Sequence, residues 1–177
     1  FGNKGYGVFR YNEMTNGLEP VSTHKYENMT LNNILAISKD SSNNYLFGTS
    51  YGLIKYTSET SYQLFNAKNG FLNNTIHAIL RNSSDDFWLS TNLGLINFDT
   101  KRNVFRSYGF GDGLKVVEFS DGAAFRDPRT GILFFGGING FVAIRADGRP
   151  EQLYMPPVYF DKLSIFGEQY NLGEFLT

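Results

Sequence analysis

One motif recurs four times in this chain, and it limits the fold more than any other sequence feature. The motif is a glycine followed by two apolar residues, and its copies are spaced 45, 42 and 46 residues apart in a sequence of 177 residues. The copies are YGVFRY at 6–11, YGLIKY at 51–56, LGLINF at 93–98 and NGFVAI at 139–144. Such a period is typical of folds built from stacked copies of one small unit.

Each repeat predicts four short strands, here named a, b, c and d in chain order. Near the end of strand b, two bulky residues are followed by a small one. The small residue is Gly48, Ser90 or Gly136 in successive copies. The glycine between strands b and c suits a tight turn with positive φ, and Gly94 is the example in the third copy. No long segment has the apolar period of a helix. The strands of the third copy are expected at about 75–81, 86–91, 94–99 and 104–108.

The composition and the strand pattern favour stacked sheets. With 17 Phe, 11 Tyr and 19 Gly, the chain suits strands and turns rather than helices. Strands such as LINF at 95–98 are apolar on both faces, so both faces of each sheet must be covered. The sequence therefore predicts an all-β fold, a partial β-propeller of about three and a half four-stranded antiparallel blades. A β-sandwich is the alternative, but it does not explain the regular period.

The repeats also predict the domain boundaries. Residues 1–155 are expected to be propeller blades, and the Pro156–Pro157 pair then interrupts the repeat. A propeller normally has four to eight blades, so the remaining blades are expected on residues outside this sequence or on another chain. The predicted segments are a partial blade at 1–27, complete blades at 28–66, 67–109 and 110–155, and a linker with the first strand of another all-β domain at 156–177.

Two stretches resemble a known family. GFLNNTIHAILRNSSDDFWLSTNLGLINFD (70–99) resembles the propeller repeat of the extracytoplasmic sensors of hybrid two-component systems, best known from gut Bacteroidetes. GLKVVEFSDGAAFRDPRTGILFFGGINGF (113–141) is similar to the last blade of their second propeller, with Val117 where the family usually has Asn. PPVYFDKLSIFGEQY (156–170) is similar to the entry of the immunoglobulin-like, tyrosine-motif β-sandwich domain that joins the propellers to the membrane helix.

The resemblance implies a periplasmic sensor fragment whose parent protein is anchored in the inner membrane. Ligands of such sensors are typically oligosaccharides released from a dietary or host glycan. Ligand binding shifts the domain geometry of a homodimer, and a histidine kinase domain elsewhere in the parent protein responds. The implied partners are an oligosaccharide, the remaining blades, a preceding propeller and a second copy of the sensor. The fragment itself is expected to be non-enzymatic, without a cofactor.

Charge and composition exclude other classes of function. The net charge of −1 does not match a basic nucleic-acid-binding surface, so no nucleic acid is expected to bind. No apolar run approaches the length of a membrane span. The absence of cysteine excludes thiol nucleophiles and cysteine-based zinc sites. No metal site is expected.

Candidate ligand residues lie in the b–c turns and d–a loops, which a propeller presents on one face around its central channel. Tyr51, Asn92 and Asn139 are the side chains of the b–c turns that do not repeat. A tyrosine ring can stack on a sugar, and an asparagine amide can bond to paired hydroxyls. Lys115 lies in a d–a loop and could meet an acidic sugar. All four are also compatible with ordinary turn or surface positions.

Other conspicuous residues favour structural roles. The repeated asparagines of the d–a loops, Asn32–Asn33 and Asn73–Asn74, are expected to shape turns. Trp88 shares its repeat position with Leu46 and Phe134, so it is expected in the core.

The titratable residues leave an enzyme as the alternative function. His77 is expected beside the channel and His24 near an outer strand, which is a poor catalytic or metal-binding pair. A propeller glycoside hydrolase or lyase would use acidic residues that face the channel. Glu118 and Asp121 are the better pair for that role, because the Asp85–Asp86 pair lies in an a–b hairpin on the opposite face.

Overall fold

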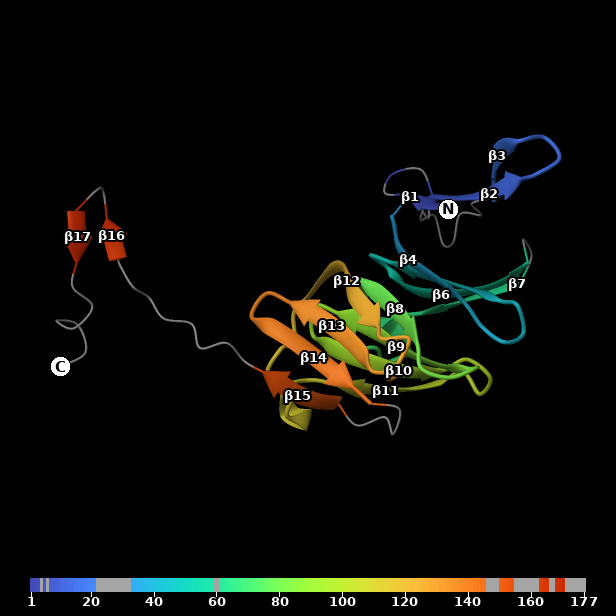
Figure 1. Ribbon diagram of the computed structural model, residues 1–177. Coiled ribbons are helices and arrows are strands. Elements are labelled where there is room, and N and C mark those ends of the chain that lie inside the picture. The colour runs from blue at the N-terminus through green and yellow to red at the C-terminus, as the bar shows by residue number, and fades with distance from the viewer. Residues whose placement is uncertain are drawn as a thin grey trace.

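The structure is a computed structural model that describes residues 1–3, 5, 7–21, 33–58, 61–145, 150–154, 163–165 and 168–170. The described chain is built almost entirely from antiparallel β-strands (Figure 1). Helix in these residues is limited to two short 3-10 turns, η1 (Ala67–Asn69) and η2 (Phe110–Asp112). Neither of these turns has the length or apolar character needed to cross a membrane.

The strands form a series of sheets in chain order, and these sheets confirm the predicted all-β, partial-propeller fold. We name the sheets blades 1 to 4. Blade 1 consists of β1 (Gly2–Asn3), β2 (Gly7–Asn12) and β3 (Gly17–Pro20). Blade 2 consists of β4 (Ile34–Lys39), β5 (Tyr45–Thr49), β6 (Gly52–Ser58) and β7 (Ser61–Phe65). Blade 3 consists of β8 (Ala78–Arg81), β9 (Asp86–Thr91), β10 (Gly94–Asp99) and β11 (Val104–Tyr108). Blade 4 consists of β12 (Phe119–Arg126), β13 (Leu133–Gly137), β14 (Gly140–Ile144) and β15 (Pro150–Tyr154).

Strands b, c and d of the third repeat have the predicted bounds, but strand a is shorter than predicted. It begins at Ala78, whereas the prediction began near residue 75. The cause is a hydrogen bond to the neighbouring sheet, because the Ile76 N–H donates to the Thr49 carbonyl at 2.9 Å. The chain is therefore hydrogen-bonded to blade 2 at Ile76, just before it joins the sheet of blade 3 at Ala78.

The first strand of each complete blade lies on the inside of the arrangement. β8 lies beside both β4 and β12, and β1 lies beside β4. Figure 1 shows the sheets following one another in chain order around these strands. The Gly122 N–H donates to the His77 carbonyl at 3.3 Å, so a backbone hydrogen bond also joins blades 3 and 4.

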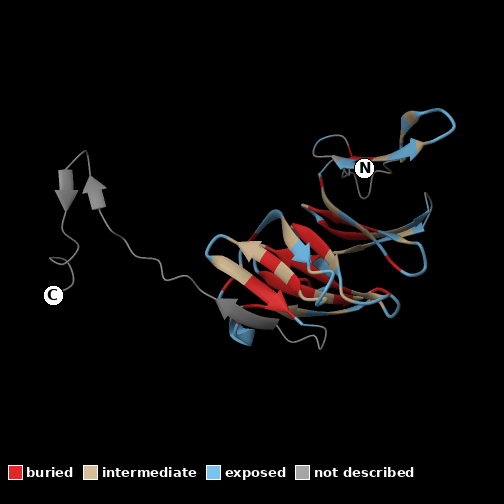
Figure 2. Cartoon of the chain, viewed as in Figure 1, coloured by how far each residue is buried: buried red, intermediate tan, exposed pale blue. Residues whose placement is uncertain are grey.

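The hydrophobic core is divided into layers between successive blades, and Figure 2 shows buried residues concentrated in the sheets. Trp88 is 1% exposed and belongs to the layer between blades 3 and 4, which confirms its predicted place in the core. The fully buried residues of that layer are Trp88, Leu95, Val116, Leu133, Phe135, Val142 and Ile144. The layer between blades 2 and 3 includes Leu46, Leu53, Ile76, Phe87, Leu89, Ile96 and Phe98.

The small residue of strand b lies where two blades approach most closely. A Cβ atom added to Gly48 would lie 2.9 Å from Cγ2 of Ile76, which is the residue that enters blade 3. A contact this short requires the neighbouring chain to move. The close approach of blades 2 and 3 therefore accounts for the small residue that the repeat carries at Gly48.

The turn between strands b and c needs glycine, as predicted. Gly52 and Gly94 have φ angles of 141° and 126°, which residues with a side chain rarely adopt. A Cβ atom on Gly94 would lie 2.0 Å from the carbonyl oxygen of Tyr108. The recurring glycine therefore allows strand d to end directly against the turn.

The C-terminal segment contains a hairpin, β16 (Leu163–Ile165) and β17 (Glu168–Tyr170). The sequence predicted a linker and the first strand of another all-β domain over 156–177, whereas the described part of this segment holds two short strands that pair with each other. The immunoglobulin-like domain and the exact domain boundaries stay predictions. His24 and Asn32 lie outside the described residues.

Candidate functional site

Two b–c turns are closed by the same threonine contacts. The Thr49 hydroxyl donates to the Gly52 carbonyl at 2.8 Å and accepts from the Tyr51 N–H at 3.0 Å. Thr91 makes the matching contacts in blade 3, with the Gly94 carbonyl at 2.9 Å and the Leu93 N–H at 3.0 Å. Each turn is thereby held in one shape, and its two central residues lie between the threonine and the glycine.

The three predicted turn residues occupy two different positions in these turns. Tyr51 and Asn139 directly precede the turn glycine, whereas Asn92 lies one residue earlier. The position of Tyr51 is taken by Leu93 in blade 3, and both are exposed. The position of Asn92 is taken by Ser50 in blade 2. The turns therefore do not form a ring of equivalent side chains, and each must be judged by its own contacts.

Asn92 belongs to a polar cluster that joins two blades. Its Oδ1 lies 2.6 Å from Nε2 of His77, and Nδ1 of the same ring lies 2.5 Å from Oδ1 of Asp121. His77 directly precedes β8 of blade 3 and is 9% exposed, while Asp121 lies on β12 of blade 4. The His77 ring therefore lies between a carboxylate oxygen at one nitrogen and an amide oxygen at the other.

This cluster was missed by reasoning from the sequence, which treated His77 only as half of a poor histidine pair. The sequence feature that could have revealed the cluster was the position of His77 within the repeat. The inner strands can be aligned on the alanine that faces the small residue of strand b. His77 then matches Leu35, and Asp121 matches Ile34 and Ile76. Two polar residues therefore replace aliphatic ones at neighbouring points where blades 3 and 4 meet.

Asn139 and Lys115 lie together in blade 4. The Asn139 side-chain amide donates to the Lys115 carbonyl at 3.2 Å, so the b–c turn and the d–a loop meet at one end of this blade. Both residues are exposed, which leaves the Lys115 ammonium at the surface. The asparagines of the preceding d–a loop shape the chain as predicted, because Asn73 Oδ1 accepts from the Thr75 N–H and Asn74 Oδ1 accepts from the Ala67 N–H, both at 2.8 Å.

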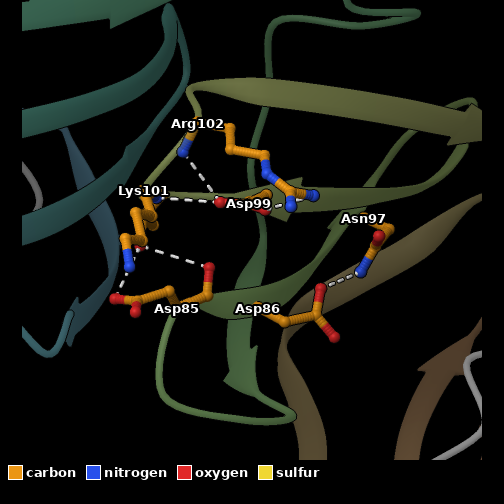
Figure 3. Close-up of polar contacts among 7 residues, drawn as sticks. Asp85, Asp86, Asn97, Asp99, Lys101 and Arg102 are labelled. Atoms are coloured by element: carbon orange, nitrogen blue, oxygen red, sulfur yellow. Dashed lines mark hydrogen bonds and ion pairs between the residues drawn. The ribbon is translucent and has the colours of Figure 1, made fainter.

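The acidic residues at the opposite ends of the strands have structural partners (Figure 3). Asp86 accepts hydrogen bonds from the side-chain amides of Asn82 and Asn97. Asp99 accepts from the backbone N–H groups of Lys101 and Arg102, both at 2.9 Å. These contacts give both acidic residues a structural role within blade 3. They therefore do not support the alternative that the chain is a glycoside hydrolase or lyase.

Asp85 links blade 3 to blade 2. Its Oδ1 accepts from the Ser41 hydroxyl at 2.6 Å and from the Thr100 hydroxyl at 3.4 Å. The Ser41 hydroxyl contributes most to holding the pKa of the Asp85 carboxyl below its ordinary value. A lowered pKa in the folded state means that the ionised carboxylate stabilises the fold above the unfolded-state pKa. This stabilisation is lost as the pH falls through the folded-state pKa.

We therefore expect Asp85→Asn to reduce the loss of stability on acidification. Urea unfolding midpoints at pH 7 and about pH 3 would be compared for the wild type and the variant, because carboxyl groups titrate in this range. Ser41→Ala removes the main partner and should change the pH dependence in the same direction. An unchanged difference between the two pH values in both variants would contradict this role of Asp85.

None of the four predicted ligand residues lines the cavity between blades 1 and 2. This cavity has a volume of about 340 Å³. Its aromatic lining includes Phe9, Tyr45, Phe47 and Tyr56. Within the described ranges, no three His, Asp or Glu side chains gather closely enough to hold a metal ion.

No protein-family profile matches the sequence, and no curated protein matches it. Solved structures do match. One is the extracellular domain of BT3049 from B. thetaiotaomicron, described as a hybrid two-component system, with 29% identity and a TM-score of 0.69 over 82% of this chain and 20% of that one. The extracellular domain of BT4673 from the same organism matches in two structures, each with a TM-score of 0.58 over 97% of this chain.

The BT4673 structures differ in how that protein is described, once as a hybrid two-component system and once as a one-component system. Their identities to this chain are 21% and 20%, over 22% and 21% of their own length, so they show the shared fold alone. The chain thus spans about a fifth of each of the extracellular domains that it matches.

Proposed function

We propose that this chain is part of the periplasmic sensor domain of a hybrid two-component histidine kinase, where it helps to recognise an oligosaccharide and to relay the signal across the inner membrane. The similarity to the extracellular domain of BT3049, at 29% identity over 82% of the chain, is the observation that carries this proposal. The resemblance of 70–99 and 113–141 to the repeats of such sensors supports it independently. The oligosaccharide part of the proposal rests on that resemblance.

The proposed role is binding rather than catalysis. Asp85, Asp86 and Asp99 are engaged in structural contacts. Asp121 is held by the His77 ring, while Glu118, its suggested catalytic partner, is an exposed residue before β12. A glycosidase needs two carboxyl groups placed on either side of a sugar bond. The contacts of these acids give more support to a binding role than to a hydrolase or lyase.

The remaining blades of the propeller are proposed partners, and the outer face of blade 4 supports this. Leu46 and Leu53 of blade 2 are fully buried against blade 3, and Trp88 at the position of Leu46 is buried against blade 4. The matching residues of blade 4, Phe134 and Phe141, are only partly buried. Another sheet would cover this apolar face. A preceding propeller and a second copy of the sensor are part of the same proposal.

Calorimetry can test the proposed function. The protein would be titrated with plant and host oligosaccharides, and the mixtures would then be analysed for products. Saturable binding without turnover is expected. Product formation would favour the hydrolase or lyase, and absence of binding to every oligosaccharide would contradict oligosaccharide recognition by this chain.

Tyr51→Ala tests whether the exposed turn ring contributes to ligand binding. The tyrosine is 41% exposed, so its loss should leave the unfolding midpoint unchanged. Loss of a stacking ring should weaken binding about five- to tenfold in the same titrations. Leu93→Ala, at the same turn position in blade 3, is the matched control and should retain the wild-type affinity. Unchanged affinity in Tyr51→Ala would remove this residue from the proposed site.

A further inference from the structure

We propose that Asp121 and Asn92, both held by His77, form a subsite that binds two neighbouring hydroxyl groups of a neutral saccharide. This inference rests on the proposed function and specifies residues and ligand chemistry for it. The subsite lies where the inner strand of blade 4 meets the b–c turn of blade 3, so neither blade forms it alone.

The repeat argues against a purely structural reason for this cluster. At the matching inner-strand positions, other copies use Ile34, Leu35 and Ile76, and the two isoleucines are buried. Aliphatic side chains therefore serve to join blades at these points. Burying the His77 ring at such a point costs desolvation that aliphatic packing does not, and Asp121 exposes its side chain where the matching isoleucines are buried. Residues that depart from the local pattern at such a cost concentrate at functional sites.

The cluster offers a donor and an acceptor on opposite sides of one buried ring. Because Oδ1 of Asn92 faces Nε2 of His77, the amide NH₂ of Asn92 is directed away from the ring. The Asp121 side chain is 43% exposed although one of its oxygens faces the ring, so part of the carboxylate reaches solvent. One sugar hydroxyl can donate to Asp121 while its neighbour accepts from Asn92. Two adjacent hydroxyls on a sugar ring match this arrangement.

The groups offered to the ligand disfavour an acidic sugar. They are the partly exposed Asp121 carboxylate and the uncharged Asn92 amide. A carboxylate repels an anionic sugar, whereas a neutral sugar can be recognised through the geometry of its hydrogen bonds. His77 acts as a positioning residue, because its buried ring orients the two side chains that contact the ligand.

NMR spectroscopy of the ¹⁵N-labelled protein can test the subsite. The probes are six neutral trisaccharides: maltotriose, cellotriose, mannotriose, galactotriose, xylotriose and arabinotriose. We expect at least one of them to shift the ring N–H signals of His77 and the side-chain amide signals of Asn92 in a saturable way. A ring with only a structural role would keep its signals unchanged during the titration.

Three variants restore residues that other blades carry at the matching positions, namely His77→Leu, Asp121→Ile and Asn92→Ser. Each is expected to weaken trisaccharide binding at least tenfold while the protein stays folded, as judged by circular dichroism. Lys101→Ala, at the opposite end of blade 3, is the control and should bind like the wild type. Asn92 lies in a partly exposed turn, so Asn92→Ser decides the question if substitution of His77 or Asp121 prevents folding.

The remaining outcomes separate this inference from the proposed function. Binding of a trisaccharide that is equally strong in all folded variants would overturn the subsite and leave oligosaccharide recognition standing. Failure of all six trisaccharides to bind the wild type would overturn the neutral-saccharide subsite, whereas the broader oligosaccharide titration would still decide the proposed function. Binding without any shift of the His77 or Asn92 signals would place the ligand elsewhere on the chain.

Discussion

Gly94→Ala is expected to lower the free energy of unfolding by about 3–5 kcal/mol, because two penalties add at one residue. The backbone at Gly94 has a φ of 126°, which alanine adopts only with strain. The new Cβ atom would also lie 2.0 Å from the Tyr108 carbonyl oxygen, so the end of β11 would have to move. Urea unfolding followed by the fluorescence of the single tryptophan measures the loss.

Two other glycines separate these penalties. Gly113 has a φ of 91° but open space around it, so Gly113→Ala should lose only about 1–2 kcal/mol to backbone strain. Gly111 has neither a positive φ nor a close neighbour, so Gly111→Ala should be nearly neutral. If Gly94→Ala unfolds at the same urea concentration as Gly111→Ala, β11 does not end as close to the turn as the structure shows.

Trp88→Ala should lower the free energy of unfolding by about 3–5 kcal/mol, the usual cost of removing a large buried ring. Trp88 is 1% exposed, and its ring centroid lies 5.1 Å from that of Tyr108. The substitution would open a cavity in the layer between blades 3 and 4. Because the variant lacks the only tryptophan, far-ultraviolet circular dichroism should follow its unfolding.

Phe134→Ala is the matched control for Trp88→Ala. Phe134 has the same repeat position in blade 4, but it lies on the face that no described sheet covers and is only partly buried. Its loss should cost about 1 kcal/mol, because less apolar surface returns to water. Similar losses in the two variants would show that the outer face of blade 4 is covered as completely as the face of blade 3.

The repeat predicted most of blade 3 because its signals are local. The turn glycine, the threonine before it and the bulky residues of strand b act within a few residues of one another. The turn glycine recurs in all four copies and the threonine contacts form in blades 2 and 3, so comparing copies reveals the strand boundaries and the buried positions. Trp88 could be assigned to the core in this way, because Leu46 and Phe134 hold the same repeat position and are also large and apolar.

The candidate site was less predictable. Asn92 could be selected because it does not repeat, but nothing in the turn itself pointed to its partner. The His77–Asp121 contact joins residues 44 positions apart, and it exists only because blade 4 lies against blade 3. The sequence shows that His77 and Asp121 are polar where the matching residues, Leu35 and Ile76, are aliphatic. It does not show that these two residues meet, because that depends on which blades are neighbours.

By itself, the sequence determined the blade as a unit, including its strand order, its turn glycines and the residues that face the core. Short-range sterics and the alternation of side chains along strands are sufficient for this. Only the tertiary structure decided how blades meet: where strand a begins, which residue lies against Gly48, and which side chains surround His77. These features depend on contacts between sheets, and the spacing of apolar residues within one repeat does not encode them.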